Sequence, residues 1–200
     1  GIDPPDHTRL RRLVSKAFTP RTIEALRPRI QALVDEALYH IAEQGQADII
    51  AELAFPLPFD VISEMLGMPA GDTEALRSWS EDIVKTIDPI ITEDEIKAAV
   101  IANRAMDEYM AGVIEWKREN PGDDLLTAMI EAEEDGDKMS SKELSDQVNL
   151  LFIAGHETTV NLIGTGIADL LSRPDQAQSI RDNGLEMNGV DELLRFVSPV

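Results

Sequence analysis

The six residues Ala154-Gly155-His156-Glu157-Thr158-Thr159 bring together side chains that could bind a ligand and handle a proton. Glycine has no side chain, so a flat and bulky ligand can approach the backbone at Gly155. A threonine hydroxyl in a helix can bond back to a carbonyl three or four residues earlier, or it can bond a ligand instead. The ionisable carboxyl group of Glu157 stands next to that hydroxyl. A packing notch would explain a glycine and a threonine alone, but the adjacent acid favours a functional site.

This stretch lies in the middle of a long predicted helix at about 141–172. Ser140 and Glu143 have the spacing of a capping box, and Pro174 prevents the helix from continuing much further. The helix therefore has about 32 residues and a length of about 48 Å. A helical wheel places the Thr158 hydroxyl within about 40° of three apolar side chains, those of Leu144, Leu151 and Leu162. A hydroxyl group thus interrupts the apolar stripe.

The sequence offers no complete metal-binding pattern of its own. His156-Glu157 matches the first half of the His-Glu-x-x-His helix of zinc proteases, but position 160 is Val160, so the second histidine is missing. The chain has no cysteine, which excludes a disulfide framework and a cysteine-ligated metal within these residues.

Composition and charge limit the classes of partner. At 200 residues and 43% hydrophobic content, the chain is one domain or part of a larger one. The net charge of −20 argues against nucleic acid, yet residues 1–29 carry +4 and the remainder −24. A basic segment on an acidic protein suggests an acidic docking partner, with ordinary surface variation as the alternative. We see no apolar run of membrane-spanning length and no signal peptide.

The basic segment contains a predicted helix that starts in Asp3-Pro4-Pro5-Asp6. His7 and Arg11 are four residues apart and fall beside its apolar stripe, where a cation needs an anionic partner. That partner is either an acid elsewhere in the chain or an anionic ligand. The predicted stripe consists of Leu10, Val14, Ala17 and Phe18. The other basic residues, which should face solvent, are Arg9, Arg12 and Lys16.

The rest of the chain reads as an all-α protein. Glu192 and Arg195 are one turn apart on a C-terminal segment and can form an ion pair. The charged run 131–138 is expected to be a solvated loop, and 48–55 is ambiguous between strand and helix. Further helices are predicted at about 30–41, 59–66, 72–87, 93–118, 123–133 and 174–181.

Three of these patterns resemble motifs of the cytochrome P450 haem-thiolate monooxygenases. Ala154 to Thr159 resembles the central-helix motif (Ala/Gly)-Gly-x-(Asp/Glu)-Thr-(Thr/Ser). Asp3 to Arg12, followed by Ala17-Phe18-Thr19-Pro20, is similar to a haem-contacting helix of bacterial members. Asp191 to Phe196 resembles the Glu-x-x-Arg helix. The motifs occur in the family's order and extend over nearly all of the chain.

The resemblance implies the central part of the mainly helical P450 fold, forming a single partial domain over 1–200. A complete member is about twice as long. The strand-rich N-terminal part and the loop whose cysteine thiolate binds the haem iron are absent from these residues. We therefore expect the fragment alone to be inactive.

The resemblance also implies roles for individual residues. Ala154 and Gly155 would make room for haem b and O2, and Glu157 and Thr158 would deliver protons to the bound oxygen. His7 and Arg11 would bind the haem propionates, and Glu192 and Arg195 would form a structural ion pair. By position alone, the roof of the substrate pocket would include Ile83, Val84, Ile87 and Ile90.

The implied activity is insertion of one oxygen atom of O2 into a small hydrophobic substrate, because both the acid and the threonine are present. Electrons would come indirectly from NAD(P)H through a ferredoxin or flavodoxin-type donor that docks near Arg9, Arg12 and Lys16. Likeness to bacterial members implies a cytoplasmic protein. One alternative is a non-enzymatic helical protein-interaction domain. A second alternative, a nucleic-acid-binding regulator, is disfavoured by the acidic remainder of the chain.

Overall fold

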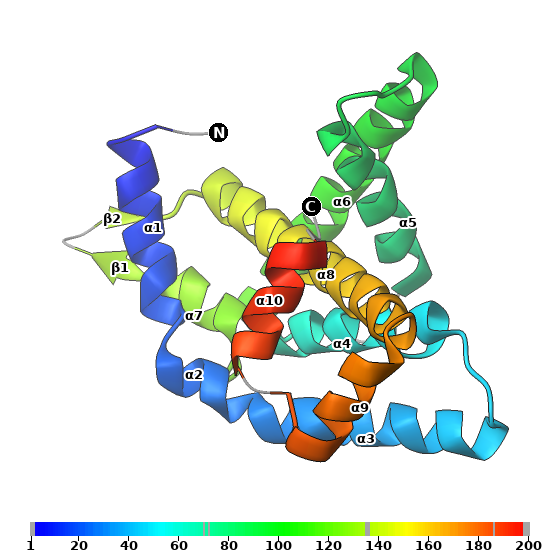
Figure 1. Ribbon diagram of the computed structural model, residues 1–200. Helices are drawn as coiled ribbons and strands as arrows, with labels where there is room; N and C mark the ends of the chain where they lie inside the picture. The colour runs from blue at the N-terminus through cyan, green and yellow to red at the C-terminus, as the bar shows by residue number, and fades with distance from the viewer. Residues whose placement is uncertain (1–2, 70, 72, 135–136, 186, 198–200) are drawn as a thin grey trace. The chain divides into compact units, whose positions relative to one another are not determined.

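The computed structural model describes residues 3–69, 71, 73–134, 137–185 and 187–197. These residues are mainly helical, which confirms the predicted class (Figure 1). The described strands are two short antiparallel segments, β1 (Glu133–Glu134) and β2 (Asp137–Lys138). Among the described residues, no helix is both long and apolar enough to cross a membrane.

The chain divides into two compact units, which we describe separately. The first comprises Gly1–Gln31 and Asp60–Ile153, and the second comprises Ala32–Phe59 and Ala154–Val200. Three helices contribute residues to both units: α3 (Arg27–Gln44), α4 (Pro56–Met65) and α8 (Ser141–Leu171).

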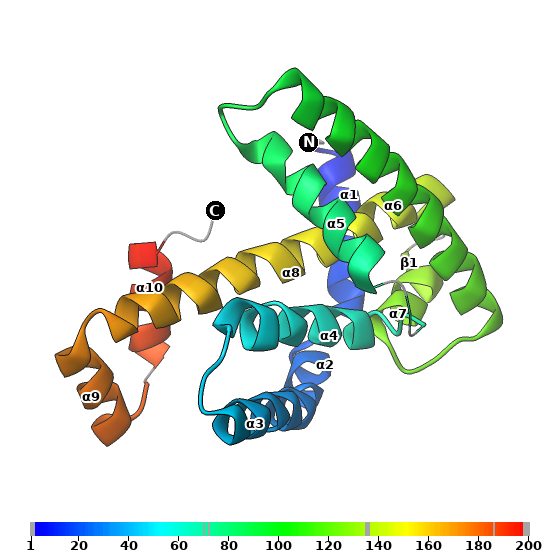
Figure 2. The ribbon, with the colours of Figure 1, turned by 90° about the vertical axis from the view of Figure 1, so that its right-hand side faces the viewer.

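In the first unit, α1 packs on α7 and α5 packs on α6, as Figures 1 and 2 both show. Buried apolar side chains line these contacts, among them Leu13 of α1 and Leu126 of α7. The elements of this unit are α1 (Asp6–Ala17), α2 (Pro20–Ala25), α5 (Thr73–Val84), the 3-10 turn η2 (Lys85–Ile87), α6 (Glu93–Glu119) and α7 (Leu125–Glu131).

The second unit contains the π-helical turn η1 (Ile50–Ala54), α9 (Pro174–Asn183) and α10 (Met187–Val197). Most of the ambiguous segment 48–55 is therefore helical. Its start is capped by Asp48, whose carboxylate accepts the backbone N–H groups of Ile50 and Ala51 at 3.0 and 3.1 Å. The side chain thus satisfies donors that the first turn of a helix leaves unpaired.

Helix α1 differs from the prediction in the face that it buries. Its buried residues are Leu10, Leu13 and Ala17, so the stripe is rotated by about one position from the predicted one. As a result, the predicted solvent-facing Arg9 is half-buried. Its guanidinium pairs with Asp137 and with Glu143. The expectation that the Arg9 side chain is fully exposed to solvent is therefore wrong.

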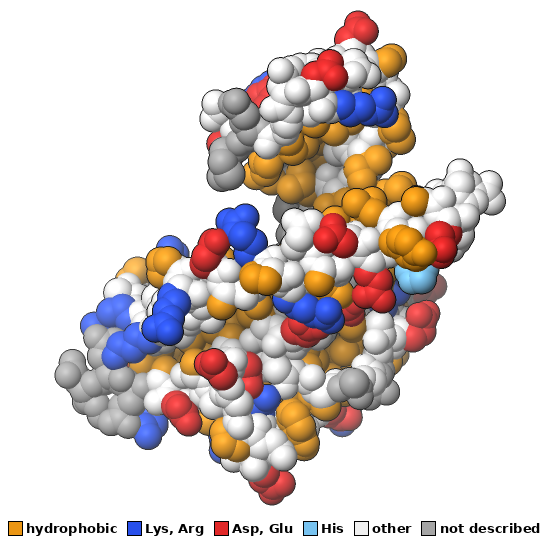
Figure 3. Space-filling model, turned by 90° about the horizontal axis from the view of Figure 1, so that it is seen from below, with side chains coloured by type: hydrophobic (Ala, Val, Ile, Leu, Met, Phe, Trp, Pro, Cys, Tyr) orange, Lys and Arg blue, Asp and Glu red, His pale blue; other side chains and the backbone are white. Residues whose placement is uncertain are grey.

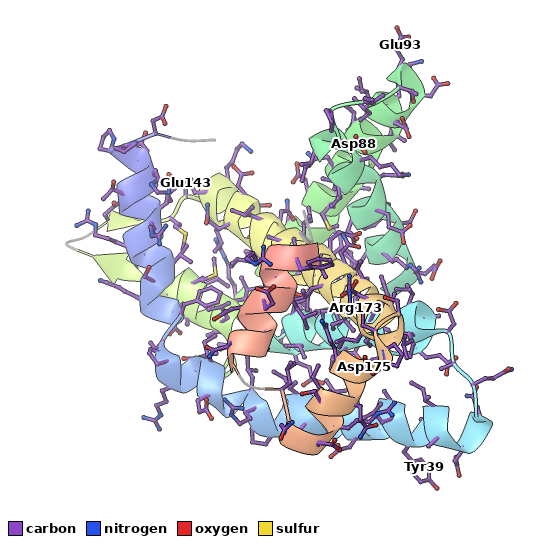
Figure 4. The ribbon with its side chains drawn as sticks, in the orientation of Figure 1. Tyr39, Asp88, Glu93, Glu143, Arg173 and Asp175 are labelled. Atoms are coloured by element: carbon purple, nitrogen blue, oxygen red, sulfur yellow. The ribbon has the colours of Figure 1, made fainter. Side chains whose placement is uncertain are left out.

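The predicted capping box at the start of α8 is present. The backbone N–H of Ser140 donates to Glu143 Oε2 at 2.8 Å, and the backbone N–H of Glu143 donates to Ser140 Oγ at 3.3 Å. Figure 4 shows Glu143 at the beginning of α8, toward α1. The groups of Ser140, followed by the Arg9 guanidinium, lower the pKa of Glu143. One carboxylate therefore both caps α8 and ties it to α1.

Replacing Glu143 with glutamine should lower the free energy of unfolding by about 0.5 to 1 kcal/mol at neutral pH, because glutamine keeps the cap but loses the charge that Arg9 binds. A lowered folded-state pKa stabilises the fold above the ordinary value of 4.5, and this contribution is lost as the pH falls through the folded-state value. Urea unfolding at several pH values should therefore show a shallower acid loss in Glu143→Gln than in the parent.

The matched control is Glu95→Gln. Glu95 forms a capping box with Thr92 at the start of α6, where its acceptor oxygen lies 2.8 Å from the Thr92 backbone nitrogen. Within the described residues no arginine pairs with Glu95, so its replacement should cost less. Equal costs for the two variants would mean that Arg9 adds nothing to the cap.

A buried ion pair joins the end of α6 to the start of α7. Lys117 Nζ donates to Asp124 Oδ2 at 2.8 Å, and the two side chains are only 5% and 10% exposed. Asp124 also caps α7 by accepting the N–H of Thr127 at 2.9 Å. Gly67, in the turn after α4, has φ +61°, and a Cβ there would lie 2.5 Å from Asp124 Cγ and 2.6 Å from Lys117 Nζ. The turn after α4 can come this close to the ion pair of Lys117 and Asp124 because Gly67 has no Cβ.

Gly67→Ala should lower the free energy of unfolding by about 2 to 4 kcal/mol, because alanine strains the left-handed backbone and displaces a buried ion pair. The control is Gly45→Ala, at φ +74° with no atom within 4 Å of the added Cβ. It should cost only the backbone strain, about 1 kcal/mol. Chemical denaturation of both variants measures the difference, and similar costs would show that the ion pair tolerates the methyl group.

Candidate functional site

The stretch 154–159 is continuous α-helix within α8. Thr158 Oγ1 donates to the carbonyl oxygen of Ala154 at 2.7 Å, and Thr159 Oγ1 donates to that of Gly155 at 3.1 Å. Of the two bonding partners that the sequence left open for the threonine hydroxyl, the structure shows the backbone carbonyl, and it does so for both threonines. Ala154 and Gly155 are exposed, while Thr158 is half-buried. A hydroxyl group is thus held one turn from a stretch of backbone that carries almost no side chain.

Glu157 is the ionisable residue that precedes Thr158 in the sequence. Its side chain is 21% exposed, so the carboxyl group has access to water yet lies partly inside the protein. Its Oε2 atom lies 3.9 Å from Nδ1 of His156. A partly buried carboxyl beside a hydroxyl can take a proton from solvent and pass it on.

His156 is buried, whereas Gly155 before it is exposed and Glu157 after it is half-buried. Its ring meets those of Phe55 and Phe59 edge-on, with centroid distances of 4.7 and 5.7 Å. All three residues belong to the second unit. The sequence suggests His156 only as a zinc ligand and does not predict this contact. No local pattern could reveal this contact, because Phe55 and His156 are far apart in the sequence.

His7 and Arg11 lie on α1 in the first unit, and both are exposed. They do not flank the buried stripe as predicted, because that stripe is rotated toward Leu13. Within the described part of the chain, neither side chain forms an ion pair with an acid. The structure thus brings together Ala154, Gly155 and the Glu157–Thr158 pair in one unit, and His7 with Arg11 in the other.

The predicted substrate residues lie in the first unit, near the connection between α5 and α6. Ile83 and Val84 are half-buried on α5, whereas Ile87 and Ile90 are 66% and 87% exposed. Their role as a pocket roof stays a prediction. Hydrophobic side chains are exposed elsewhere too, as Figure 3 shows.

The predicted pair between Glu192 and Arg195 is present on α10. Arg195 Nε and Nη2 donate to the two carboxylate oxygens at 2.8 and 2.6 Å. A second contact, which the sequence did not reveal, joins α10 to the end of α8. Arg173 pairs with Asp169 and lies 4.7 Å above the ring centroid of Phe196. Figure 4 shows Arg173 at the turn from α8 into α9.

Among the described residues, no group of three or more histidine, aspartate and glutamate side chains could hold a metal ion.

Residues 2–191 match the family model described as cytochrome P450. The chain belongs to the cytochrome P450 family. This confirms the resemblance drawn from the three motifs.

Curated relatives of this P450 chain support the assignment along its whole length. It is 49% identical over 201 residues to cytochrome P450 107B1 of Saccharopolyspora erythraea, covering 100% of this chain and 48% of that protein. It is 43% identical over 204 residues to the vitamin D(3) 25-hydroxylase of Pseudonocardia autotrophica, again covering 100% and 48%. The chain therefore spans about half the length of the curated relatives it matches.

Solved P450 structures have the same fold. The crystal structure of P450BioI, in complex with an acyl carrier protein ligated to hexadec-9Z-enoic acid, superposes with a TM-score of 0.91 at 34% identity. The match covers 98% of this chain and 50% of that one. The mainly helical architecture is thus the one that this family shares.

Proposed function

We propose that the protein containing this chain is a haem-dependent monooxygenase that inserts one oxygen atom of O2 into an organic substrate. The observation that carries the proposal is the half-buried Glu157 next to the back-bonded Thr158, one turn from the exposed backbone of Ala154 and Gly155. Similarity to a vitamin D(3) 25-hydroxylase supports a hydroxylating enzyme.

The residues of the chain fit a haem group. A flat macrocycle needs a wall without protruding side chains, which the exposed Ala154 and Gly155 offer. Its propionates need cations, and His7 and Arg11 are exposed and form no ion pair within the described residues. Ala154 and Gly155 would therefore face haem b, the family resemblance assigns the propionates to His7 and Arg11, and a cysteine ligand would come from residues outside this chain. When bound, haem supplies the redox chemistry that splits O2.

The chain's own contribution is proton delivery. Splitting O2 so that one atom leaves as water consumes two protons and two electrons. Glu157 can take each proton from solvent and pass it to the Thr158 hydroxyl, which donates its own proton toward the space beside Gly155. Thr158 receives a proton for each one that it gives, so it ends the cycle unchanged. Its bond to the Ala154 carbonyl keeps the hydroxyl in place between transfers.

Electrons would reach the haem from a ferredoxin or flavodoxin-type donor, itself reduced by NAD(P)H. The docking surface would include Arg12 and Lys16, which are exposed on α1. Arg9 is not part of it, because its charge is used by Asp137 and Glu143. We propose a small hydrophobic substrate, in keeping with the apolar residues predicted for the pocket roof.

Thr158→Ala should uncouple electron consumption from product formation, because it removes the hydroxyl that donates the proton. We expect product per NAD(P)H consumed to fall at least about fivefold, with the missing electrons recovered as hydrogen peroxide. Thr159→Ala is the matched control, since its hydroxyl makes the same kind of bond one residue later. Equal coupling in the parent and in Thr158→Ala would remove Thr158 from proton delivery.

Arg11→Ala should weaken haem retention, because a propionate loses a charge-assisted hydrogen bond worth about 1.5 to 3 kcal/mol. Transfer of haem to apomyoglobin should therefore be about tenfold faster or more. Arg21→Ala, an exposed arginine on α2, serves as the control. Haem content and transfer rate equal to those of the parent would refute the propionate assignment.

A further inference from the structure

The proposed mechanism uses the residues on both sides of His156 but gives His156 itself no part. Its side chain is fully buried, whereas Gly155 before it is exposed and Glu157 after it is half-buried. A buried imidazole in the centre of an oxygen-binding motif therefore needs its own explanation.

The imidazole is clamped by two aromatic rings. The interplanar angles to Phe55 and Phe59 are 88° and 86°, so the imidazole stands edge-on to both. The two phenyl rings in turn stack on each other, with centroids 5.8 Å apart and an angle of 23°. Edge-on contacts of this kind are directional, since the positive edge of one ring points at the negative face of another. The cluster therefore fixes the direction of the His156 side chain.

Fixing His156 also fixes its neighbours. Successive residues of a helix are rotated by 100°, so the direction of one buried side chain sets those of Gly155, Glu157 and Thr158. An anchor for these side-chain directions is needed here, because a glycine and two β-branched residues weaken the helix where the chemistry would occur. The aromatic anchor compensates for a locally weak helix.

The imidazole ring of His156 also lies close to the carboxyl group of Glu157. Nδ1 of His156 lies 3.9 Å from Oε2 of Glu157, close enough for the ring to favour one orientation of the carboxyl group. A phenyl ring could supply the packing but not this polar contact. Histidine is thus the residue type that serves both purposes.

We propose that His156 is a positioning residue for proton delivery: held between Phe55 and Phe59, it keeps the Glu157 carboxyl group in the orientation that serves Thr158. This inference rests on the proposed function. It assigns no proton transfer to the imidazole, which touches neither substrate nor cofactor in the proposed scheme.

The test uses His156→Phe in the full-length, haem-loaded protein, since phenylalanine keeps an aromatic ring and removes the nitrogen. The control is His40→Phe, an exposed histidine on α3 whose ring contacts Tyr39 at 6.1 Å. The first readout is the infrared band of the Glu157 carboxyl group in resting protein labelled with 13C-glutamate, assigned by its loss in Glu157→Gln. The second is product formed per NAD(P)H consumed.

We expect the carboxyl band to shift in His156→Phe, with haem content retained, and coupling to fall severalfold. In the Glu157→Gln background the same change should have no further effect on coupling, because both act through one carboxyl group. His40→Phe should leave the band and the coupling as in the parent. An unshifted band, or coupling losses that multiply in the double variant, would overturn the inference.

Further variants distinguish a failure of the His156 inference from a loss of haem or a failure of the proposed proton route. If His156→Phe fails to retain haem, Phe59→Leu replaces it, because this change loosens the clamp and leaves the imidazole; an unshifted band there overturns the inference. If Glu157→Gln and Thr158→Ala both leave coupling unchanged, the proposed proton route fails. If those two variants uncouple the enzyme and His156→Phe does not, only the role of His156 fails.

Discussion

The hydrogen bond from the Thr158 hydroxyl to the Ala154 carbonyl is the interaction on which the candidate site depends. It fixes the Thr158 hydroxyl beside Ala154 and Gly155, which have almost no side chain. The group that fixes it is a backbone carbonyl. A carbonyl that already accepts an amide proton gives up the hydroxyl at modest cost, because the net value of such a bond is only about 1 kcal/mol. The donor is therefore held firmly enough to be placed and weakly enough to be released.

A helix that carries such a site must be fixed at other points, and α8 is fixed at its start, its middle and its end. Glu143 caps the start and takes the charge of Arg9. His156 anchors the middle through aromatic rings. Arg173 holds the end, where it pairs with Asp169 and covers Phe196 of α10. None of these contacts lies on the bare face itself, so that face stays open to a ligand.

The sequence predicted what depends on neighbours along the chain. The capping box at Ser140 and the proline at 174 placed the ends of α8 within a residue or so of those observed. The stripe of α1 was harder, because both Leu13 and Val14 are apolar and a helical wheel does not choose between them. Packing on α7 makes that choice. It also turns Arg9 toward Asp137, which is 128 residues away in the sequence and beyond the reach of any local pattern.

The contact between His156 and Phe55 is also beyond the reach of a local pattern, because it joins positions 101 residues apart. The motif predicts the chemistry proposed for positions 154–158 from residue type and spacing. It did not explain the histidine, since an imidazole in a motif looks the same whether it binds a metal or packs against rings. A family resemblance predicts the residues that take part in the reaction more readily than the residues that position them.

The ion pairs of Arg9 change which charges of α1 are available to a docking partner. A net charge of −20 would repel an acidic electron donor if the whole protein acted as one charge. Salt confines each charge to a range of about 8 Å at physiological ionic strength, so a docking partner responds to the nearest side chains. On α1 these are the exposed Arg12 and Lys16, while Arg9 is neutralised locally by Asp137 and Glu143. The link between α1 and α8 therefore uses the charge of Arg9, and the proposed docking surface on α1 consists of the exposed Arg12 and Lys16.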